Sequence, residues 1–419
     1  MGGETTRRGF FKTAVAFAAA GALARRGVFA GTQGANRNNP IWLMTSAFPG
    51  ETFEGVLKRA KSVGAQGLEL CVFRRDSDRK DHTATHLDYE TFDLEAARRV
   101  VRRCNEEGLR ISVGAYDNLI GGDEAQQMAN RDHILKLVRI AALLGGDGND
   151  VVCGTFVGYD HVLGRQDRGF EKNLEKFRDV FTPILHYARD LGVTMCVENC
   201  PMEGWQPATA PDAYNNLPGC LAARKLMYAI LDDKASAALQ ETYDPSHDIW
   251  QHIDPSDVIE AMDFKRLRRI HIKGTRNFPR SADAIHWGRL YPEQVVDKAL
   301  AAKAGVPVAK SEWDRMNYEP RLPGFGGNDS CDWTKFLETL MSKGYKYPFV
   351  IENEACNSSH TGNMGAILQG FRATVLNTAP QVWPLTADGY KFDETQMYGD
   401  PMKAPEKDIP VATWKSLAG

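Results

Sequence analysis

The stretch VTMCVEN, residues Val193–Asn199, is an apolar strand pattern that ends in the carboxylate Glu198. Three later segments repeat this form: ETYDPSH (Glu241–His247), RIHIK (Arg269–Lys273) and PFVIENE (Pro348–Glu354). Residues that follow the parallel strands of an α/β barrel project into one shared mouth, even when they are far apart in sequence. The four segments therefore predict one site built from Glu198, Asp244, His271 and Glu352.

Strand patterns alternate with helical patterns along the chain, which is typical of a parallel sheet built from βα units. Apolar residues recur at three- and four-residue spacing between the strands and predict amphipathic helices, such as the one from Phe170 to Ala188 that ends before Gly192. The predicted strands are Ile41–Met44, Gly67–Val72, Arg110–Ala115, Val151–Phe156, Val193–Val197, Leu239–Tyr243, Arg269–Ile272 and Phe349–Ile351. An α/β fold of the (β/α)8 type is the expected architecture.

Short motifs around the four ligand-type residues strengthen this prediction. They are Asp-Pro-Ser-His at 244–247, His-Ile-Lys at 271–273, and Gly326-Gly327 followed by Asp332-Trp333. Together they resemble the xylose-isomerase-like superfamily of TIM barrels, the sugar phosphate isomerase/epimerase family. The resemblance extends from about Ile41 to Pro380 and implies a TIM barrel over residues 38–380.

The N-terminus has the pattern of an export signal. Thr6-Arg7-Arg8-Gly9-Phe10-Phe11-Lys12 reads as a twin-arginine motif, and the Ala-rich segment Thr13–Ala24 that follows is too short to span a bilayer. Val28-Phe29-Ala30 offers a cleavage site, so residues 1–30 are predicted to be a signal peptide. A periplasmic or secreted enzyme that uses the twin-arginine export machinery is expected, and its substrate is then expected to lack a phosphate.

Two segments exceed a minimal barrel. A long insertion after the seventh strand, about 277–323, is expected to roof the site, because loops at the mouth of a barrel set substrate choice. A surface role or an oligomer contact is the alternative for this insertion. Residues 381–419 form a C-terminal extension that we expect to pack on the barrel exterior.

Three carboxylates and one imidazole form a ligand set that suits one divalent metal ion, Mn²⁺, Mg²⁺, Co²⁺ or Zn²⁺. In the family that the motifs resemble, two metal-bound glutamates on opposite sides of a sugar transfer its protons. By this resemblance Glu198 and Glu352 are the catalytic residues, and Asp244 and His271 complete the metal shell. The expected substrate-binding residues are His247, Lys273, Arg276, Glu69, His161 and Trp205.

The composition fits an enzyme that acts on small molecules. The net charge of −3 provides no basic surface for nucleic acid, and nothing after the leader is long enough for stable membrane insertion. Cys71, Cys153 and Cys196 lie in predicted strands as core residues, whereas Cys200 and Cys220 flank one loop and could form a disulfide. A homo-oligomer is compatible with this composition.

The expected activity is that of a metal-dependent isomerase or epimerase acting by proton abstraction α to a carbonyl. A lyase that cleaves 3-keto-glycosides by β-elimination is the main alternative, because it begins with the same step at the same residues. A DNA-repair endonuclease of this fold would need a histidine-rich zinc site and a basic face, whereas the chain has ten histidines and an acidic balance. A non-catalytic sugar-binding barrel would not need a complete set of metal ligands and bases.

Overall fold

The computed structural model describes residues 39–76, 84–145, 151–201, 216–249, 251, 253–277, 298–305, 318–321, 323, 329–354, 385–386, 389–390 and 401–418. The residues from Asn39 onward belong to one compact unit. The predicted signal peptide, Trp205 and most of the insertion at 277–323 lie outside the described residues.

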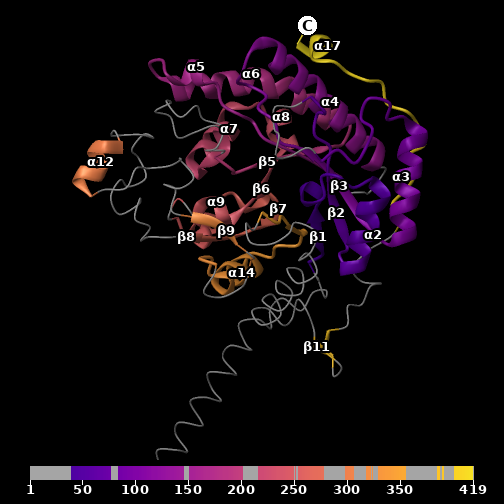
Figure 1. Ribbon diagram of the computed structural model, residues 1–419. Helices are drawn as coiled ribbons and strands as arrows, with labels where there is room; N and C mark the ends of the chain where they lie inside the picture. Colours follow the sequence, from indigo (N-terminus) through magenta and orange to yellow (C-terminus); the bar gives the residue numbers. More distant parts are fainter. Residues whose placement is uncertain are drawn as a thin grey trace, which may run out of the picture. The chain divides into compact units, whose positions relative to one another are not determined.

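Eight parallel strands close into a barrel in the order β1-β10-β7-β6-β5-β4-β3-β2 (Figure 1). Their bounds are β1 Ile41–Met44, β2 Gly67–Cys71, β3 Arg110–Ala115, β4 Val152–Thr155, β5 Thr194–Glu198, β6 Leu239–Tyr243, β7 Leu267–Ile272 and β10 Phe349–Ile351. The predicted (β/α)8 barrel and its eight strands are therefore confirmed. The largest difference is at β7, which begins two residues earlier than the apolar pattern indicated, because Leu267 pairs with Glu241 of β6 ahead of an irregularity in the ladder at Arg268.

Helices surround this barrel in the regions where apolar residues recur with helical spacing (Figure 1). The longest are α4, Glu124–Gly145, and α6, Gly169–Asp190, whose apolar stripe is buried against the strands. The others near the barrel are α2 Phe53–Val63, α3 Leu94–Glu107, α5 His161–Gly164, α7 Leu221–Ile230, α8 Asp233–Ala238, α9 Pro245–Ile249, α10 Pro255–Ala261 and α14 Trp333–Ser342, with the 3-10 helices η2 Thr45–Ala47, η4 Leu217–Gly219 and η5 Phe264–Arg266.

Local signals explain where these helices start and stop. The hydroxyl of Thr52 accepts a hydrogen bond from the Gly55 N–H at 3.1 Å and caps the start of α2. Gly64 ends the same helix with φ 72°, a left-handed conformation that favours glycine.

The barrel interior is polar as well as apolar. The guanidinium of Arg269 lies 4.7 Å from the centre of the Trp42 ring and is almost completely buried. A Cβ at Gly67 would come within 2.5 Å of that ring, so a glycine there makes room for the indole. Because side chains alternate along a strand, Arg269 and His271 point to the same side of β7, towards the interior.

The insertion after β7 begins and ends in a two-stranded antiparallel ribbon. β8, Gly274–Asn277, pairs with β9, Tyr318–Arg321, and the short helix α12, Lys298–Ala304, lies between them in sequence. The Asn277 side-chain amide donates to the carbonyl of Ile249 in α9 at 2.8 Å. The two ends of the insertion are thus held together directly after His271 and Lys273.

The last described segment, 401–418, ends in the helix α17, Trp414–Ala418, and lies against α3 and α4. The Asn105 amide donates to the Met402 carbonyl at 2.8 Å and accepts from its N–H at 2.7 Å. Arg139 of α4 pairs with Asp408 at 2.6 Å. The preceding part of the extension contains the hairpin of β11 (Leu385–Thr386) and β12 (Gly389–Tyr390).

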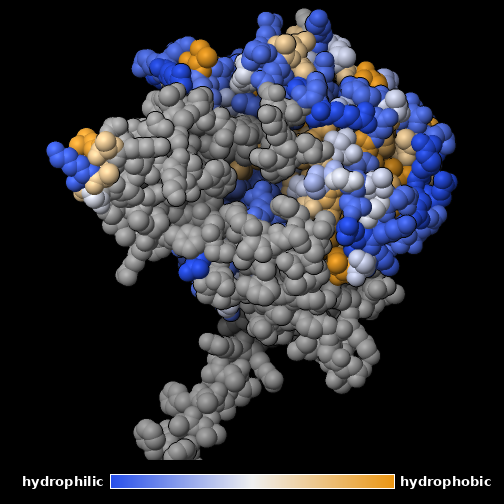
Figure 2. Space-filling model, in the orientation of Figure 1, coloured by the Kyte–Doolittle hydropathy of each residue, from blue (hydrophilic) through white to orange (hydrophobic). Residues whose placement is uncertain are grey.

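The outer surface is mainly hydrophilic over the described helices. Figure 2 shows hydrophilic residues along the outward faces of α3, α5 and α6, and others at the bottom of a hollow near the centre of the same face. Within the part of the chain described, no helix combines the length and apolar character needed to cross a lipid bilayer. Cys200 and Cys220 are not joined by a disulfide, so that possibility is not realised here.

Candidate active site

The four ligand-type residues predicted from the strand ends lie close together. Glu198 is the last residue of β5, Asp244 follows β6, His271 is in β7 and Glu352 follows β10. The Nδ1 atom of His271 lies 3.1 Å from Glu352 Oε2 and 3.4 Å from Glu198 Oε1. Glu198, Asp244 and His271 are at most 3% exposed and Glu352 is 6% exposed, so these groups meet in a nearly closed interior.

The geometry of these atoms suits a metal ion. Glu198, His271 and Glu352 form one group, and Glu198, Asp244 and His247 form another, with the ligand atoms of each group within 4.8 Å of one another. Among the described residues, Asp244 Oδ2, His271 Nδ1 and Glu352 Oε2 are buried without a well-formed hydrogen bond. Buried polar atoms rarely remain in that state, and a cation held by either group would satisfy the atoms of that group.

His247, which was predicted to bind the substrate, lies directly beside two of the metal-type ligands. Its Nε2 is 3.2 Å from Asp244 Oδ2 and 3.4 Å from Glu198 Oε1. Asp244 directly precedes α9 and His247 lies three residues later in its first turn, so the two side chains come to the same side. The nitrogen of His247 is therefore placed as well for metal binding as for contact with a substrate oxygen.

Lys273 brings a positive charge to the mouth. Its ammonium lies 3.0 Å from Asp244 Oδ2, 3.3 Å from Glu352 Oε1 and 3.1 Å from Glu354 Oε2. Burial by itself would lower the pKa of Lys273, but the surrounding carboxylates raise it well above its usual value. Glu354 was not among the residues predicted from sequence, although it is the second carboxylate of the segment PFVIENE.

Glu198 and His271 shift each other's pKa in opposite directions. Burial by itself would raise the pKa of Glu198, but the charge of His271 and the hydrogen bonds from His247 and His271 lower it far below its usual value. Burial also disfavours the charged form of His271, yet Glu69 and Glu198 raise its pKa well above its usual value.

Two buried asparagines hold the strand ends in place, and the sequence prediction did not include them. Asn199 directly follows Glu198 and exchanges two hydrogen bonds with the backbone of Asp244. The amide of Asn216 donates to the Cys200 carbonyl at 2.6 Å, and its oxygen accepts from Gly158 N–H at 2.8 Å. The pair Glu198-Asn199 at a strand end was the available sequence signal, whereas Asn216 had none.

The remaining predicted contacts have different locations. Glu69 is the middle residue of β2 and lies behind His271, with its Oε2 3.3 Å from His271 Nε2. His161 starts α5, where its ring packs 5.4 Å from that of Tyr159. Arg276 lies in β8 opposite Glu319, and Trp205 is outside the described residues. The structure thus gathers Glu198, Asp244, His247, His271, Lys273 and Glu352 into one cluster.

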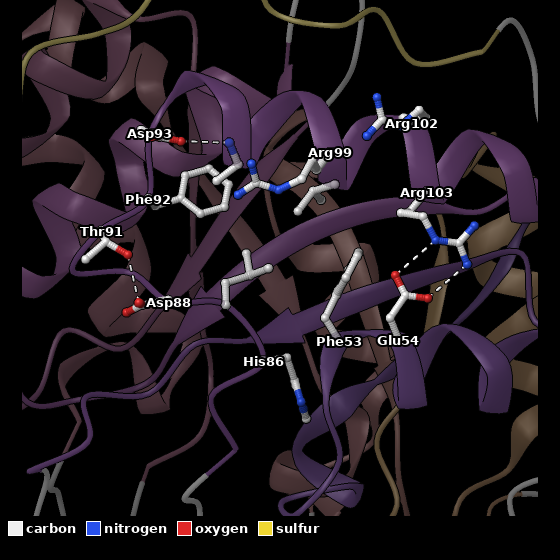
Figure 3. A pocket seen from close by; sticks show the side chains of 13 residues that line it. Phe53, Glu54, His86, Asp88, Thr91, Phe92, Asp93, Arg99, Arg102 and Arg103 are labelled. Atoms are coloured by element: carbon white, nitrogen blue, oxygen red, sulfur yellow. Dashed lines mark hydrogen bonds and ion pairs between the residues drawn. The ribbon is translucent and has the colours of Figure 1, made fainter.

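A second hollow, of about 660 Å³, lies on the outside of the barrel between α2 and α3. Figure 3 shows Arg103 of α3 bound to the carboxylate of Glu54 of α2 across it, with His86 at its lower edge. Apolar residues such as Phe53 and Phe92 line this hollow together with Arg99, Arg102 and Arg103. None of the clustered metal-type ligands lines it, so it is separate from the candidate active site.

Comparisons with known proteins agree with this architecture. Residues 57–372 match the model of a family described as "Xylose isomerase-like TIM barrel". A xylose isomerase domain protein from Planctomyces limnophilus is 13% identical with a TM-score of 0.51, covering 82% of this chain and 99% of its own. An L-ribulose 3-epimerase is 13% identical with a TM-score of 0.52, covering 82% and 96%.

A 3-keto-D-glucoside 4-epimerase from E. coli is 14% identical with a TM-score of 0.51, and the alignment covers 80% of this chain and 99% of the epimerase. At such identities these likenesses show a shared fold. No curated protein sequence matches the chain.

Proposed function

Because the chain belongs to the xylose isomerase-like TIM barrel family, we propose that it is a divalent-metal-dependent sugar isomerase or epimerase. In this proposal the enzyme removes a proton from the carbon next to a carbonyl of a non-phosphorylated sugar and returns it.

The observation that carries the proposal is the position of two buried carboxylates on strands from different parts of the barrel. Glu198 of β5 and Glu352 after β10 both approach His271 Nδ1, at 3.4 and 3.1 Å. β6 and β7 separate β5 from β10 in the sheet, so the two carboxylates reach the centre from different directions. Such a pair can remove a proton on one side of a bound sugar and supply one on another.

Glu198, Asp244, His271 and Glu352 would hold the metal ion, with His247 in reach as a further ligand. When bound, a divalent ion polarises the sugar carbonyl and stabilises the negative charge of the enediolate. The mixture of carboxylate and imidazole ligands suits Mn²⁺, Mg²⁺, Co²⁺ or Zn²⁺.

The other groups of the cluster bind and orient the substrate. The ammonium of Lys273, at 3.0 Å from Asp244, is placed to donate to an oxygen that gains negative charge. His247 can hold a neighbouring hydroxyl through its Nε2–H. Because both side chains are buried, water has little access to the carbon that loses its proton.

The charges of the site favour a sugar without a phosphate. Lys273 lies beside the clustered carboxylates and already pairs with Asp244, Glu352 and Glu354. A phosphate would need further donors to offset these carboxylates. The predicted export signal points in the same direction, since sugar phosphates are largely retained in the cytoplasm.

The test is to incubate the purified protein with free ketoses and with 3-keto-glucosides in D₂O, in the presence of each metal ion, and to identify the products. Solvent deuterium at the carbon next to the carbonyl of an intact sugar supports the proposal. Release of the aglycone would instead identify a lyase acting by β-elimination from the same residues. If no product or exchange appears with any ion and sugar, the proposed function is wrong.

A further inference from the structure

A chain of polar groups crosses the interior of the barrel behind the candidate metal site. The hydroxyl of Tyr116, just after β3, donates to Glu69 Oε1 of β2. The other carboxylate oxygen of Glu69 lies 3.3 Å from His271 Nε2 of β7. All three side chains are at most 2% exposed, and β2 and β7 are not adjacent strands of the barrel.

We propose that Glu69 and Tyr116 are positioning residues that fix the orientation and tautomer of His271, so that its Nδ1 is the metal ligand. This inference rests on the metal site of the proposed function. Glu69 accepts the Nε2–H of His271, which leaves Nδ1 facing Glu198 and Glu352. Tyr116 in turn holds the carboxylate of Glu69. Rotation of the His271 ring would therefore break its buried contact with Glu69, and the carboxylate could not follow the ring without losing the hydrogen bond from Tyr116.

Two glycines on neighbouring strands leave space for this chain of groups. A Cβ at Gly154 of β4 would lie 2.5 Å from the Tyr116 hydroxyl and 3.1 Å from Glu69 Oε1. A Cβ at Gly114 of β3 would lie 3.1 Å from the same Glu69 oxygen. Even alanine at 154 would therefore displace the hydroxyl, and the absence of both side chains is needed for the contact.

The protonation of these groups suits their proposed roles. Burial and the charge of Glu69 raise the pKa of Tyr116 well above its usual value, so its hydroxyl keeps the proton that it donates. The Glu69 carboxylate presents its other oxygen to His271 Nε2 at 3.3 Å. The ionised carboxylate is the acceptor that a metal-bound histidine usually requires of its second nitrogen.

Metal affinity and the state of the His271 ring test the proposal independently of activity. Zn²⁺ affinity is measured by competition with a chelator in the wild type and in Glu69→Gln, Tyr116→Phe and Gly154→Ala. Loss of such a partner typically weakens metal binding about 10–100-fold. We expect a loss of this size for Glu69→Gln and smaller losses for the other two variants.

Tyr345→Phe is the matched control, because it also removes a buried hydroxyl. The hydroxyl of Tyr345 donates to the Pro348 carbonyl at 2.7 Å and has no part in the contacts among Tyr116, Glu69 and His271. The Zn²⁺ affinity of this variant should equal that of the wild type. Unfolding of each apoprotein is measured in parallel. A variant that unfolds more readily but keeps wild-type affinity would show that Glu69 and Tyr116 have a structural role alone, which overturns the proposal.

Nitrogen-15 NMR of histidine-labelled protein, with His271→Gln used for assignment, provides the second readout. We expect the Nε2 of His271 to keep its proton when Zn²⁺ is bound and its proton resonance to move in Glu69→Gln. An unchanged resonance, or Zn²⁺ on Nε2, would contradict the proposal. Should the wild type bind no metal ion, the proposed function fails, whereas the same resonance in the apoprotein still reports whether Glu69 orients the ring.

Discussion

Asn199 and Asp244 join the ends of β5 and β6 through a reciprocal pair of hydrogen bonds. The Asn199 amide donates to the Asp244 carbonyl at 3.0 Å, and the Asp244 N–H donates to the Asn199 oxygen at 2.7 Å. One oxygen of the Asp244 carboxylate then accepts from the Ser246 N–H at 2.8 Å. These contacts direct the other oxygen towards Lys273 and His247.

Replacing Asn199 by alanine should therefore damage both stability and the site. Two buried backbone groups of Asp244 lose their partner, which costs about 1–3 kcal/mol for each unsatisfied group. Metal affinity should fall as well, because Asp244 is no longer held. Urea unfolding and chelator competition measure the two effects.

Asn105→Ala is the matched control, since Asn105 holds Met402 by the same reciprocal pair on the outside of the barrel. It should lower stability and leave metal affinity unchanged. If Asn199→Ala and Asn105→Ala lower the metal affinity by the same factor, the role given to Asn199 is wrong.

Neutral substitutions of Glu198 and Glu352 should affect metal binding less than a neutral substitution of Asp244 does. Glu198→Gln and Glu352→Gln keep an oxygen near the metal but remove a base, so turnover should fall by about 10²–10⁴-fold while some metal stays bound. Asp244→Asn should lose metal and activity together. Solvent exchange at the substrate carbon and metal content are measured for each variant.

Glu175→Gln, an exposed substitution on α6, serves as the control for these variants and should behave as the wild type. Near-normal exchange in both glutamine variants with metal bound would place the bases elsewhere, and His247 would be the next residue to replace.

Asp160 should stabilise the start of α5 in a pH-dependent way. Its carboxylate accepts from the Val162 and Leu163 N–H groups at 2.9 and 3.1 Å and pairs with Lys176 at 2.6 Å. Burial opposes ionisation, but the contacts with Lys176 and the two N–H groups lower the pKa of Asp160 below its usual 3.8. Because the pKa of Asp160 is lower in the folded protein than in the unfolded chain, its stabilisation is complete at pH values above the unfolded pKa. The stabilisation disappears as the pH falls through the lower pKa of the folded state.

Asp160→Ala should therefore lower the free energy of unfolding by about 1 kcal/mol at pH 7, the usual value of a helix cap. The difference from the wild type should shrink as the pH falls below about 4. Urea unfolding at several pH values checks this, with Asp167→Ala at an exposed position as the control. A difference that grows as the pH falls would contradict the assigned contacts.

Export through the twin-arginine route is a proposal from the sequence, and its residues lie outside the described part of the chain. Replacing Arg7 and Arg8 together by lysine should leave the precursor in the cytoplasm, because recognition depends on the two guanidinium groups. Fractionation of cells followed by N-terminal sequencing of the exported form tests it. The nearby pair Arg25 and Arg26, replaced in the same way, is the control, and unchanged export of the first variant would refute the signal.

The sequence by itself determined the barrel and most of the clustered residues. Apolar runs such as Ile41–Met44 form strands because their side chains are buried on both faces, and glycines such as Gly64 and Gly344 end helices by adopting positive φ. Glu198, Asp244, His271 and Glu352 could be expected to meet because parallel strands of a barrel direct their carboxyl ends to one mouth. These are properties of local pattern and of the fold class.

Only the tertiary structure decided which side chains touch one another. Glu69 was expected to bind the substrate, yet its carboxylate lies 3.3 Å from His271 Nε2, because the closed barrel brings side chains of the non-adjacent strands β2 and β7 together in its interior. The pairing of Lys273 with Glu354, and of Asn105 with Met402, likewise joins residues remote in sequence. The contact between Glu69 and His271 depends on the closure of the barrel and on the space that Gly114 and Gly154 leave for Glu69 and Tyr116, neither of which is encoded in a local pattern.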